Sequence, residues 1–375
     1  MASKIILHIG QQKSGTTFLQ HMLQDNSDVL AAEGISYPVP RDWDRGQRTV
    51  ANHEWSSYGL LGSEYPWVSE QRAAREDASW RALLDQVHAW PGTVLLSAEA
   101  LSVVRAAAAR RLLDALGVDD AEIVITARSL GRSLPSLWQQ HVRNGRSTSF
   151  DGYLESLAQH REKGSDHIEN DPAAHIWRAF ALSGLVRRWS AAGAARVRVV
   201  TTPGRPVDLL WHRFAQALGR PELARIPVLA DVDRTAHTGL TASETVVLAS
   251  LNAAIRDGSW SRRDADRIRQ IVTEGFQRRA ERGGKIVVPP EWRARIAEWS
   301  MEDLADLAGT GAEIVGDIDD LRYDPDREQA CPPTTEEAGR AGAAAIHALA
   351  DHTMRESRIR RVARRGRKLL LRPLA

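Results

Sequence analysis

The sequence has almost no cysteine and no long apolar run, and both absences narrow the kind of protein. Cys331 is the single cysteine among 375 residues, so no disulfide can form within the chain, which suits a reducing compartment. No run approaches the roughly 20 apolar residues of a membrane-spanning helix. The first apolar run is too short for a secretory leader. We therefore expect a cytoplasmic protein.

Basic charge is concentrated at the C-terminal end. The net charge is +2, from 50 basic and 48 acidic residues. Eight of the basic residues and no acid lie from Arg358 onward, so the rest of the chain has 42 basic and 48 acidic residues, a charge of about −6. A mildly acidic body does not suit nucleic-acid binding. The basic tail leaves two alternatives open, peripheral contact with an anionic membrane or a solvated end.

The most informative stretch lies within the first 20 residues. Ile5 to Ile9 is a short apolar run typical of a buried parallel strand. The next segment is Gly10-Gln-Gln-Lys-Ser-Gly-Thr-Thr17, and apolar residues at helical spacing follow it. The amides and dipole of a first helical turn favour an anion, and the lysine adds a full charge. The segment therefore predicts a phosphate-binding loop, with simple helix capping by its hydroxyls as the alternative.

The loop differs from the phosphate loop of nucleotide triphosphatases, G-x-x-x-x-G-K-S/T. Gly10 and Gly15 have the required separation. Thr16 occupies the place of the lysine, which lies upstream at Lys13. The displaced lysine argues against an ordinary nucleotide triphosphatase or kinase.

Strand and helix patterns alternate along the chain. Short apolar runs predict strands near residues 4–9, 93–97, 122–127 and 196–201. This alternation predicts an α/β fold with a mostly parallel central sheet flanked by helices. We expect an α/β domain over residues 1–320, with a helical cap after about residue 240. An extension over 321–375 would hold an alanine-rich helix and the basic tail, joined through an exposed acidic connection at 317–333.

Polar residues follow the predicted strands, where ligands bind in open parallel sheets. Glu99 follows the second strand and is expected to face the same crevice as Lys13, either as a proton acceptor or as a helix-capping residue. Arg128 ends the third strand, and its planar guanidinium suits a phosphate, with Ser136 eight residues later. His53 lies near aromatic residues in a polar stretch that either walls a substrate pocket or is anchored by those aromatics.

With these residues in this order, the chain resembles the sulfotransferases that use 3′-phosphoadenosine 5′-phosphosulfate (PAPS). In that family the 5′-phosphosulfate loop joins the first strand to the first helix and carries its lysine ahead of the glycine, as residues 10–17 do. An arginine at a strand end and a serine eight residues later hold the 3′-phosphate, as Arg128 and Ser136 would. The likeness covers roughly residues 4–220. It implies the three-layer, P-loop NTPase-like sulfotransferase fold.

The resemblance also implies a reaction and a set of contacts. A sulfuryl group would pass to a hydroxyl or amine of a small molecule, sugar or glycolipid, without a metal, and leave 3′-phosphoadenosine 5′-phosphate (PAP). The expected cofactor contacts are Gln12, Lys13, Ser14, Gly15, Thr16, Thr17, Arg128 and Ser136. Lys13 would neutralise the leaving oxygen. Glu99 would be the base, with His53 as second candidate, because branches of the family use either residue type.

Two other functions are open alternatives. A P-loop small-molecule kinase shares the sheet and the loop, but it needs a lysine after the second glycine and an acidic strand end to hold magnesium. A non-catalytic nucleotide-binding or membrane-docking module would use the loop or the basic tail without chemistry. The presence of Lys13 together with Glu99 argues against the second.

Overall fold

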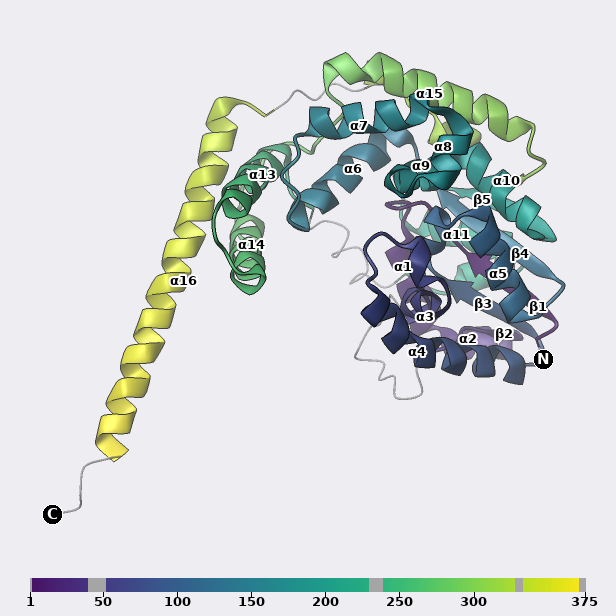
Figure 1. Cartoon of the computed structure of the whole chain (residues 1–375), viewed down its shortest axis with the longest axis horizontal. Coiled ribbons are helices and arrows are strands. Elements are labelled where there is room, and N and C mark those ends of the chain that lie inside the picture. Colours follow the sequence, from purple (N-terminus) through teal and green to yellow (C-terminus); the bar gives the residue numbers. More distant parts are fainter. Residues whose placement is uncertain (1, 40–51, 229–238, 328–332, 371–375) are drawn as a thin grey trace. The chain divides into compact units, whose positions relative to one another are not determined.

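The computed structural model describes residues 2–39, 52–228, 239–327 and 333–370 (Figure 1). Contacts divide the chain into two compact units. The first unit comprises Met1–Leu134, Leu154–Ala236 and Pro290–Arg327, and the second comprises Pro135–Tyr153, His237–Pro289 and Glu328–Ala375. The second unit thus groups the helices between residues 242 and 277 with the C-terminal helix, which was predicted to lie in a separate extension, whereas the helix at 290–308 belongs to the first unit. Cys331 lies outside the described residues.

The first unit is built on a parallel sheet, which confirms the predicted α/β fold. Its strands follow the order β2-β3-β1-β4-β5-β6, and every neighbouring pair is parallel. The strands are β1 Lys4–His8, β2 Ile35–Ser36, β3 Thr93–Ser97, β4 Ala121–Ala127, β5 Arg196–Thr201 and β6 Glu313–Val315. The four predicted strands are all present. The two short edge strands, β2 and β6, were not predicted.

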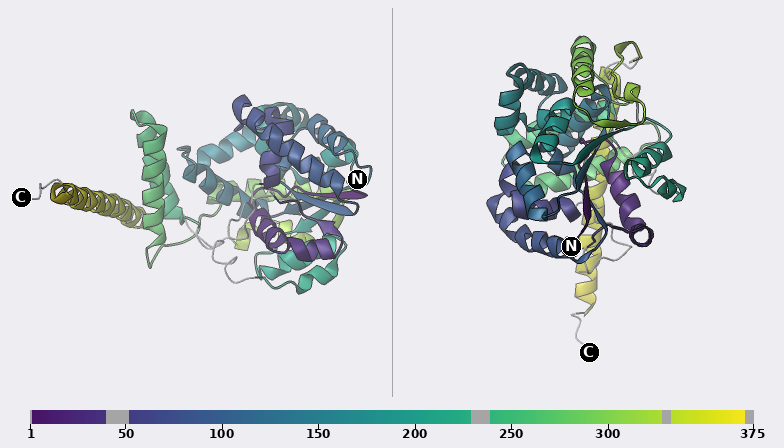
Figure 2. Two further views of the ribbon diagram at one scale, coloured as in Figure 1. Left: turned by 90° about the horizontal axis from the view of Figure 1, so that it is seen from below. Right: turned by 90° about the vertical axis from the view of Figure 1, so that its right-hand side faces the viewer.

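Helices cover both faces of this sheet (Figure 2). Among the described residues, the helices wholly within the first unit are α1 Thr16–Asp25, α2 Ser27–Ala32, α3 Asn52–Leu61, α4 Glu70–Ala89, α5 Ala106–Leu116, α8 Gly164–Asn170, α9 His175–Phe180, α10 Leu182–Ala192, α11 Asp208–Ala217 and α15 Pro290–Ala308. Short 3₁₀ helices are η1 Gly62–Glu64, η2 Glu99–Val103, η3 Pro172–Ala174, η4 Pro221–Arg225, η5 Ile318–Leu321 and η6 Pro325–Arg327. Two helices, α6 Leu130–Arg143 and α7 Phe150–Glu162, run from one unit into the other.

Side-chain alternation explains how the sheet buries both faces. Successive residues of a strand point to opposite faces, and all residues of β4 are buried. Ile6, Leu95 and Val124 belong to one core cluster with Leu19 of α1 and Trp211 of α11. That cluster is the core on one face of the sheet. The near-continuous apolar strands therefore follow from a sheet covered on both sides.

The second unit is helical where the structure describes it. It contains α13 Ala242–Asp257, α14 Arg262–Gln277 and α16 Thr335–Leu370, and α16 packs against α13 and α14. Ala341 and Ala345 are buried in this packing. The described part of the chain contains no helix that is both long and apolar enough to span a membrane. The side chains of the basic tail lie outside the described residues, so its membrane contact stays a prediction.

The register aligns the carboxyl ends of the central strands. Lys4 lies beside Thr93 and His8 beside Ser97, so β1 and β3 begin and end together. β4 continues past β1 on its other side, and its last residue, Ala127, lies beside the last residue of β5. The loop after β1 and the residues that follow β3 and β4 consequently meet at one edge of the sheet.

One local prediction was wrong in part, around residues 320–323. The acidic segment after residue 317 was expected to be an exposed connection, but Leu321 and Tyr323 are only 5% and 6% exposed. Asp320 accepts a hydrogen bond from Thr201 Oγ1 at 3.1 Å and pairs with Arg213. The acids of this segment therefore anchor it to the end of β5, while two apolar side chains between them enter the core.

Candidate functional site

The loop between β1 and α1 has a tightly constrained backbone. At Gly10 an added Cβ would lie 2.1 Å from Oγ1 of Thr126, so no side chain fits there. Gly15 has a φ of 92°, in the left-handed region that glycine tolerates. Lys13 also has a positive φ, 68°. A non-glycine residue in that region costs roughly 1–2 kcal/mol, and such strain clusters at functional sites. The fold holds the one lysine of the loop in this conformation.

Ser14 stabilises the loop through hydrogen bonds with other protein groups. Its hydroxyl donates to the Gln11 carbonyl at 2.6 Å and lies 2.7 Å from Oγ1 of Thr126. Its amide also donates to the Gln11 carbonyl, at 3.2 Å, and its own carbonyl accepts from Thr202 Oγ1 at 2.8 Å. The hydroxyl and the amide of Ser14, which were expected to contact a phosphate, therefore both donate to a protein carbonyl instead. The structure gives Ser14 a positioning role.

The first turn of α1 is open to an anion. Gly15 is its N-terminal cap and supplies no side-chain hydrogen bond to the helix. The first amides of a helix have no intrahelical acceptor, and the helix dipole adds positive potential there. Thr17 in this turn is exposed, and Gln12 and Lys13 are partly exposed. The predicted loop thus has amide donors and a neighbouring cation at the helix start, which is the arrangement that binds phosphates.

Glu99 begins η2, just beyond β3, and contacts the start of α1. Its Oε2 accepts a hydrogen bond from the Thr16 hydroxyl. Burial raises the pKa of Glu99 to about 7; the Thr16 hydrogen bond opposes this rise, the nearby Glu54 adds to it, and the charge of Lys13 opposes it. The structure thus brings Thr16, Glu99 and Lys13 together at one edge of the sheet. A carboxyl with a pKa near neutrality can exchange a proton at physiological pH.

Glu54 is a second carboxylate beside Glu99, and it was not predicted from the sequence. It lies in α3, and its Oε2 accepts a hydrogen bond at 3.3 Å from the amide of Ala100, next to Glu99 in η2. Its Oε1 accepts from the hydroxyl of Tyr58 at 2.6 Å. Glu54 therefore both fixes the start of η2 and raises the pKa of Glu99. No motif marked it, because α3 and η2 meet only in the folded chain.

His53 lies close to β3 but its ring is fully engaged. Nδ1 accepts a hydrogen bond from the amide of Ser97 at 3.0 Å, and Nε2 donates to the carbonyl of Pro38 at 2.7 Å. The side chain is buried, and burial lowers its pKa to about 4, although the two backbone hydrogen bonds oppose that shift. Neither ring nitrogen is left to take a substrate proton. Between the two predicted bases, the geometry favours Glu99.

Arg128 follows β4 and forms hydrogen bonds with the loop between β1 and α1. Its Nη1 donates to the carbonyl of Lys13 at 3.2 Å, and its amide donates to Oε1 of Gln11 at the same distance. Burial, and secondly the charge of Arg132, lower its pKa to about 10, so it stays positive at neutral pH. Its Nε is buried without a hydrogen-bond partner. An unpaired buried donor costs about 1–3 kcal/mol, so this atom favours an incoming oxygen.

A small cavity adjoins Arg128. It has a volume of about 20 Å³, and its lining includes Gln11, Phe180 and Asp303. That volume has room for about one water molecule. The cavity can therefore hold a solvent molecule or a single ligand atom beside the arginine.

Arg132 adds a second cation that the sequence analysis did not select. It lies one helical turn beyond Arg128, in α6, and lowers the pKa of Arg128 electrostatically. Two arginines four residues apart at a helix start form a local positive region that suits a phosphate. In the sequence, the only signal for this pair was the four-residue spacing between the two arginines, which was not used.

Ser136 lies farther along α6, beyond Leu134, where the first unit ends. It is partly exposed and belongs to the second unit. The other predicted site residues all lie in the first unit. The role of Ser136 beside Arg128 stays a prediction.

Comparison with known proteins gives one similar solved structure and no family. No family model matches the sequence, and no curated protein gives a significant match. Among solved structures, a sulfotransferase from Alicyclobacillus acidocaldarius is similar, with a TM-score of 0.42 and 15% sequence identity. The similarity covers 84% of this chain and 98% of that chain. A likeness this distant does not assign an activity to this chain.

Proposed function

We propose that this protein is a sulfotransferase that moves a sulfuryl group from PAPS to a hydroxyl or amine of a small-molecule, sugar or lipid acceptor. The observation that carries the proposal is the Thr16–Glu99 contact. In this contact a carboxyl of pKa about 7 lies against the first turn of α1, the proposed anion site, and the charge of Lys13 acts on it. Base, cation and amide donors lie together at the carboxyl edge of the sheet, where such folds bind ligands.

Lys13, the α1 amides and Glu99 have separate roles in the proposed transfer reaction. The acceptor oxygen or nitrogen attacks the sulfur in line, the bond from sulfur to the bridging oxygen breaks, and PAP leaves. Negative charge grows on that bridging oxygen, and Lys13 with the α1 amides stabilises it. The carboxylate of Glu99 accepts the proton from the acceptor, a role that typically contributes about 10²–10⁴-fold. No step needs a metal.

Arg128 is the proposed ligand of the 3′-phosphate. Its buried Nε lacks a partner, and its Nη1 contacts the backbone of Lys13, so a phosphate bound there would be coupled to the loop. Arg132 adds charge next to it. Ser136 is proposed to complete this subsite, as the family resemblance implies. This subsite would distinguish PAPS from ATP, which has no 3′-phosphate.

The decisive experiment measures PAP binding by calorimetry with and without magnesium, followed by transfer from labelled PAPS to a metabolite extract. We expect magnesium-independent PAP binding that weakens at least about tenfold in Lys13→Ala and Arg128→Ala. Lys285→Ala and Arg196→Ala are matched controls, because both side chains are exposed and outside the site. Equal affinity for ATP, or a need for magnesium, would support a P-loop kinase instead. Binding without any transfer would support a non-catalytic module.

A further inference from the structure

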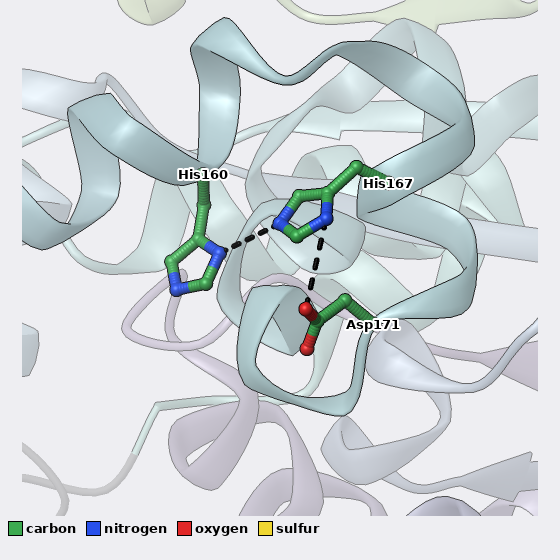
Figure 3. A group of neighbouring side chains, drawn as sticks. All are labelled: His160, His167 and Asp171. Carbon is green, nitrogen blue, oxygen red and sulfur yellow. Dashed lines mark hydrogen bonds and ion pairs between the residues drawn. The ribbon is translucent and has the colours of Figure 1, made fainter.

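Two histidines and an aspartate form a compact cluster that the proposed chemistry does not use (Figure 3). His160 lies in α7 and His167 in α8, and Asp171 directly follows α8. His160 Nδ1 lies 2.8 Å from His167 Nε2, and His167 Nδ1 lies 3.6 Å from Oδ2 of Asp171. One possible ligand atom from each residue lies within 4.8 Å of the other two.

We propose that His160, His167 and Asp171 bind a divalent transition-metal ion of the zinc class. Two imidazoles and one carboxylate are a donor set that suits such ions, with water as the fourth ligand. Zinc binds nitrogen at about 2.0–2.1 Å, so tetrahedral ligand atoms lie about 3.3 Å apart. The two histidine nitrogens are closer than this, at 2.8 Å, and the other ligand atoms lie within 4.8 Å, so their separations need to change by about 1.5 Å or less to reach the tetrahedral geometry. All three residues are partly exposed, which gives the ion access from solvent.

The backbone around the cluster supports this geometry. Gly164 has a φ of 83° and forms the tight turn between α7 and α8 that brings the two histidines together. Asp171 uses only Oδ1 to cap η3, where it accepts from the amide of Ala173 at 2.8 Å. Its Oδ2 faces His167. The aspartate thus has one oxygen for the fold and one for a ligand.

A bound ion would also stabilise the neighbourhood of Glu99. The buried Arg178 donates from Nη1 to the carbonyls of Glu169 and Asp171, at 3.2 and 3.0 Å. Its Nε donates to the carbonyl of Val103 at 2.6 Å, in the 3₁₀ helix that Glu99 begins. An ion bound by His160, His167 and Asp171 would link the end of α7 to α8. Because Arg178 connects the end of α8 to η2 by hydrogen bonds, the ion would also restrain η2. The proposed role of the metal is structural.

The test is metal titration of the chelator-treated full chain, with Co²⁺ as a spectroscopic probe. We expect about one equivalent of Co²⁺ to give the visible absorption of a tetrahedral site, and Zn²⁺ to displace it. Zn²⁺ should raise the midpoint of thermal unfolding, because it binds the folded state. Mg²⁺ should do neither, since it prefers oxygen ligands.

Variants localise the ion. His160→Ala and His167→Ala should each weaken Co²⁺ binding at least about tenfold and remove the thermal shift. His212→Ala is the matched control, because this exposed histidine lies in α11 of the same unit. Far-ultraviolet circular dichroism checks that each variant is folded, and Asp171→Ala serves if one histidine variant is not. The proposal is overturned if the wild-type chain binds Zn²⁺ more weakly than about 100 μM, or if the double histidine variant binds it equally well. The histidines would then form only a hydrogen-bonded pair.

Discussion

The hydroxyl of Thr16 donates a hydrogen bond to the carboxylate of Glu99, and so joins the first turn of α1 to the start of η2, just beyond β3. The contact links two parts of the proposed site that are 83 residues apart in the sequence. Because the hydroxyl stabilises the ionised carboxylate, it lowers the pKa of Glu99 against the larger effect of burial. Thr16 thus lowers the pKa of the proposed base and is also part of the helix turn proposed to bind the anion.

The first prediction concerns this tuning. Thr16→Val keeps the volume but removes the donor, so the pKa of Glu99 should rise above its present value of about 7. The acid limb of the pH–rate profile should move to higher pH, with turnover at pH 7 reduced about tenfold. Thr16→Ser restores the donor and should restore the profile. A general loss of turnover without movement of the limb would assign Thr16 a purely structural role.

The second prediction concerns the proton acceptor itself. Glu99→Gln keeps an oxygen for Thr16 but cannot accept a proton, so turnover should fall about 10²–10⁴-fold while PAP affinity changes little. In the wild type, turnover should rise with pH through about 7, because the carboxylate is the active form. Glu54→Gln should leave transfer measurable and lower the pH of that limb, since Glu54 raises the pKa of Glu99. Full activity of Glu99→Gln across the pH range would rule out Glu99 as the base.

The third prediction separates the charge of Lys13 from its backbone strain. Its φ of 68° is costly for any side chain but not for glycine. Lys13→Gly should therefore be more stable than Lys13→Ala by about 1 kcal/mol in urea denaturation. Both variants should lose PAP affinity to the same extent, because both lack the ammonium group. Equal stability of the two variants would show that the backbone relaxes at this position.

Much of this arrangement was predictable from the sequence. The apolar runs and their glycine breaks predict the central strands, and parallel strands necessarily bring the loop, Glu99 and Arg128 to one edge. The edge strands are two and three residues long, too short to show a periodic pattern. Contacts such as Glu54 with η2 depend on how α3 packs, so no local signal marks them. The internal hydrogen bonds of Ser14 were hidden for the same reason.

The last prediction concerns acid stability and rests on His8. Its ring lies between Oγ of Ser97 and Oγ1 of Thr126, with N–O distances of 2.8 and 3.1 Å, and joins the ends of β3, β1 and β4. Burial lowers its pKa to about 3, so it is neutral in the folded protein below the pH at which an unfolded histidine takes up a proton. The unfolded state therefore binds more protons between about pH 6.5 and 3, and stability falls as pH falls through this window.

The expected slope from His8 alone is about 1.4 kcal/mol per pH unit within that window, and His53 adds a similar slope down to about pH 4. His8→Gln should be less stable at pH 8, because it alters a buried polar contact, yet its stability should depend less steeply on pH below 6. His347→Ala, an exposed histidine of α16, is the control and should keep the wild-type slope. Urea denaturation at half-unit steps of pH measures the free energy of unfolding of the wild type and the two variants. An unchanged slope in His8→Gln would contradict the prediction. It would mean that His8 takes up a proton in the folded protein as readily as in the unfolded chain, and that the strand ends accommodate a charged ring.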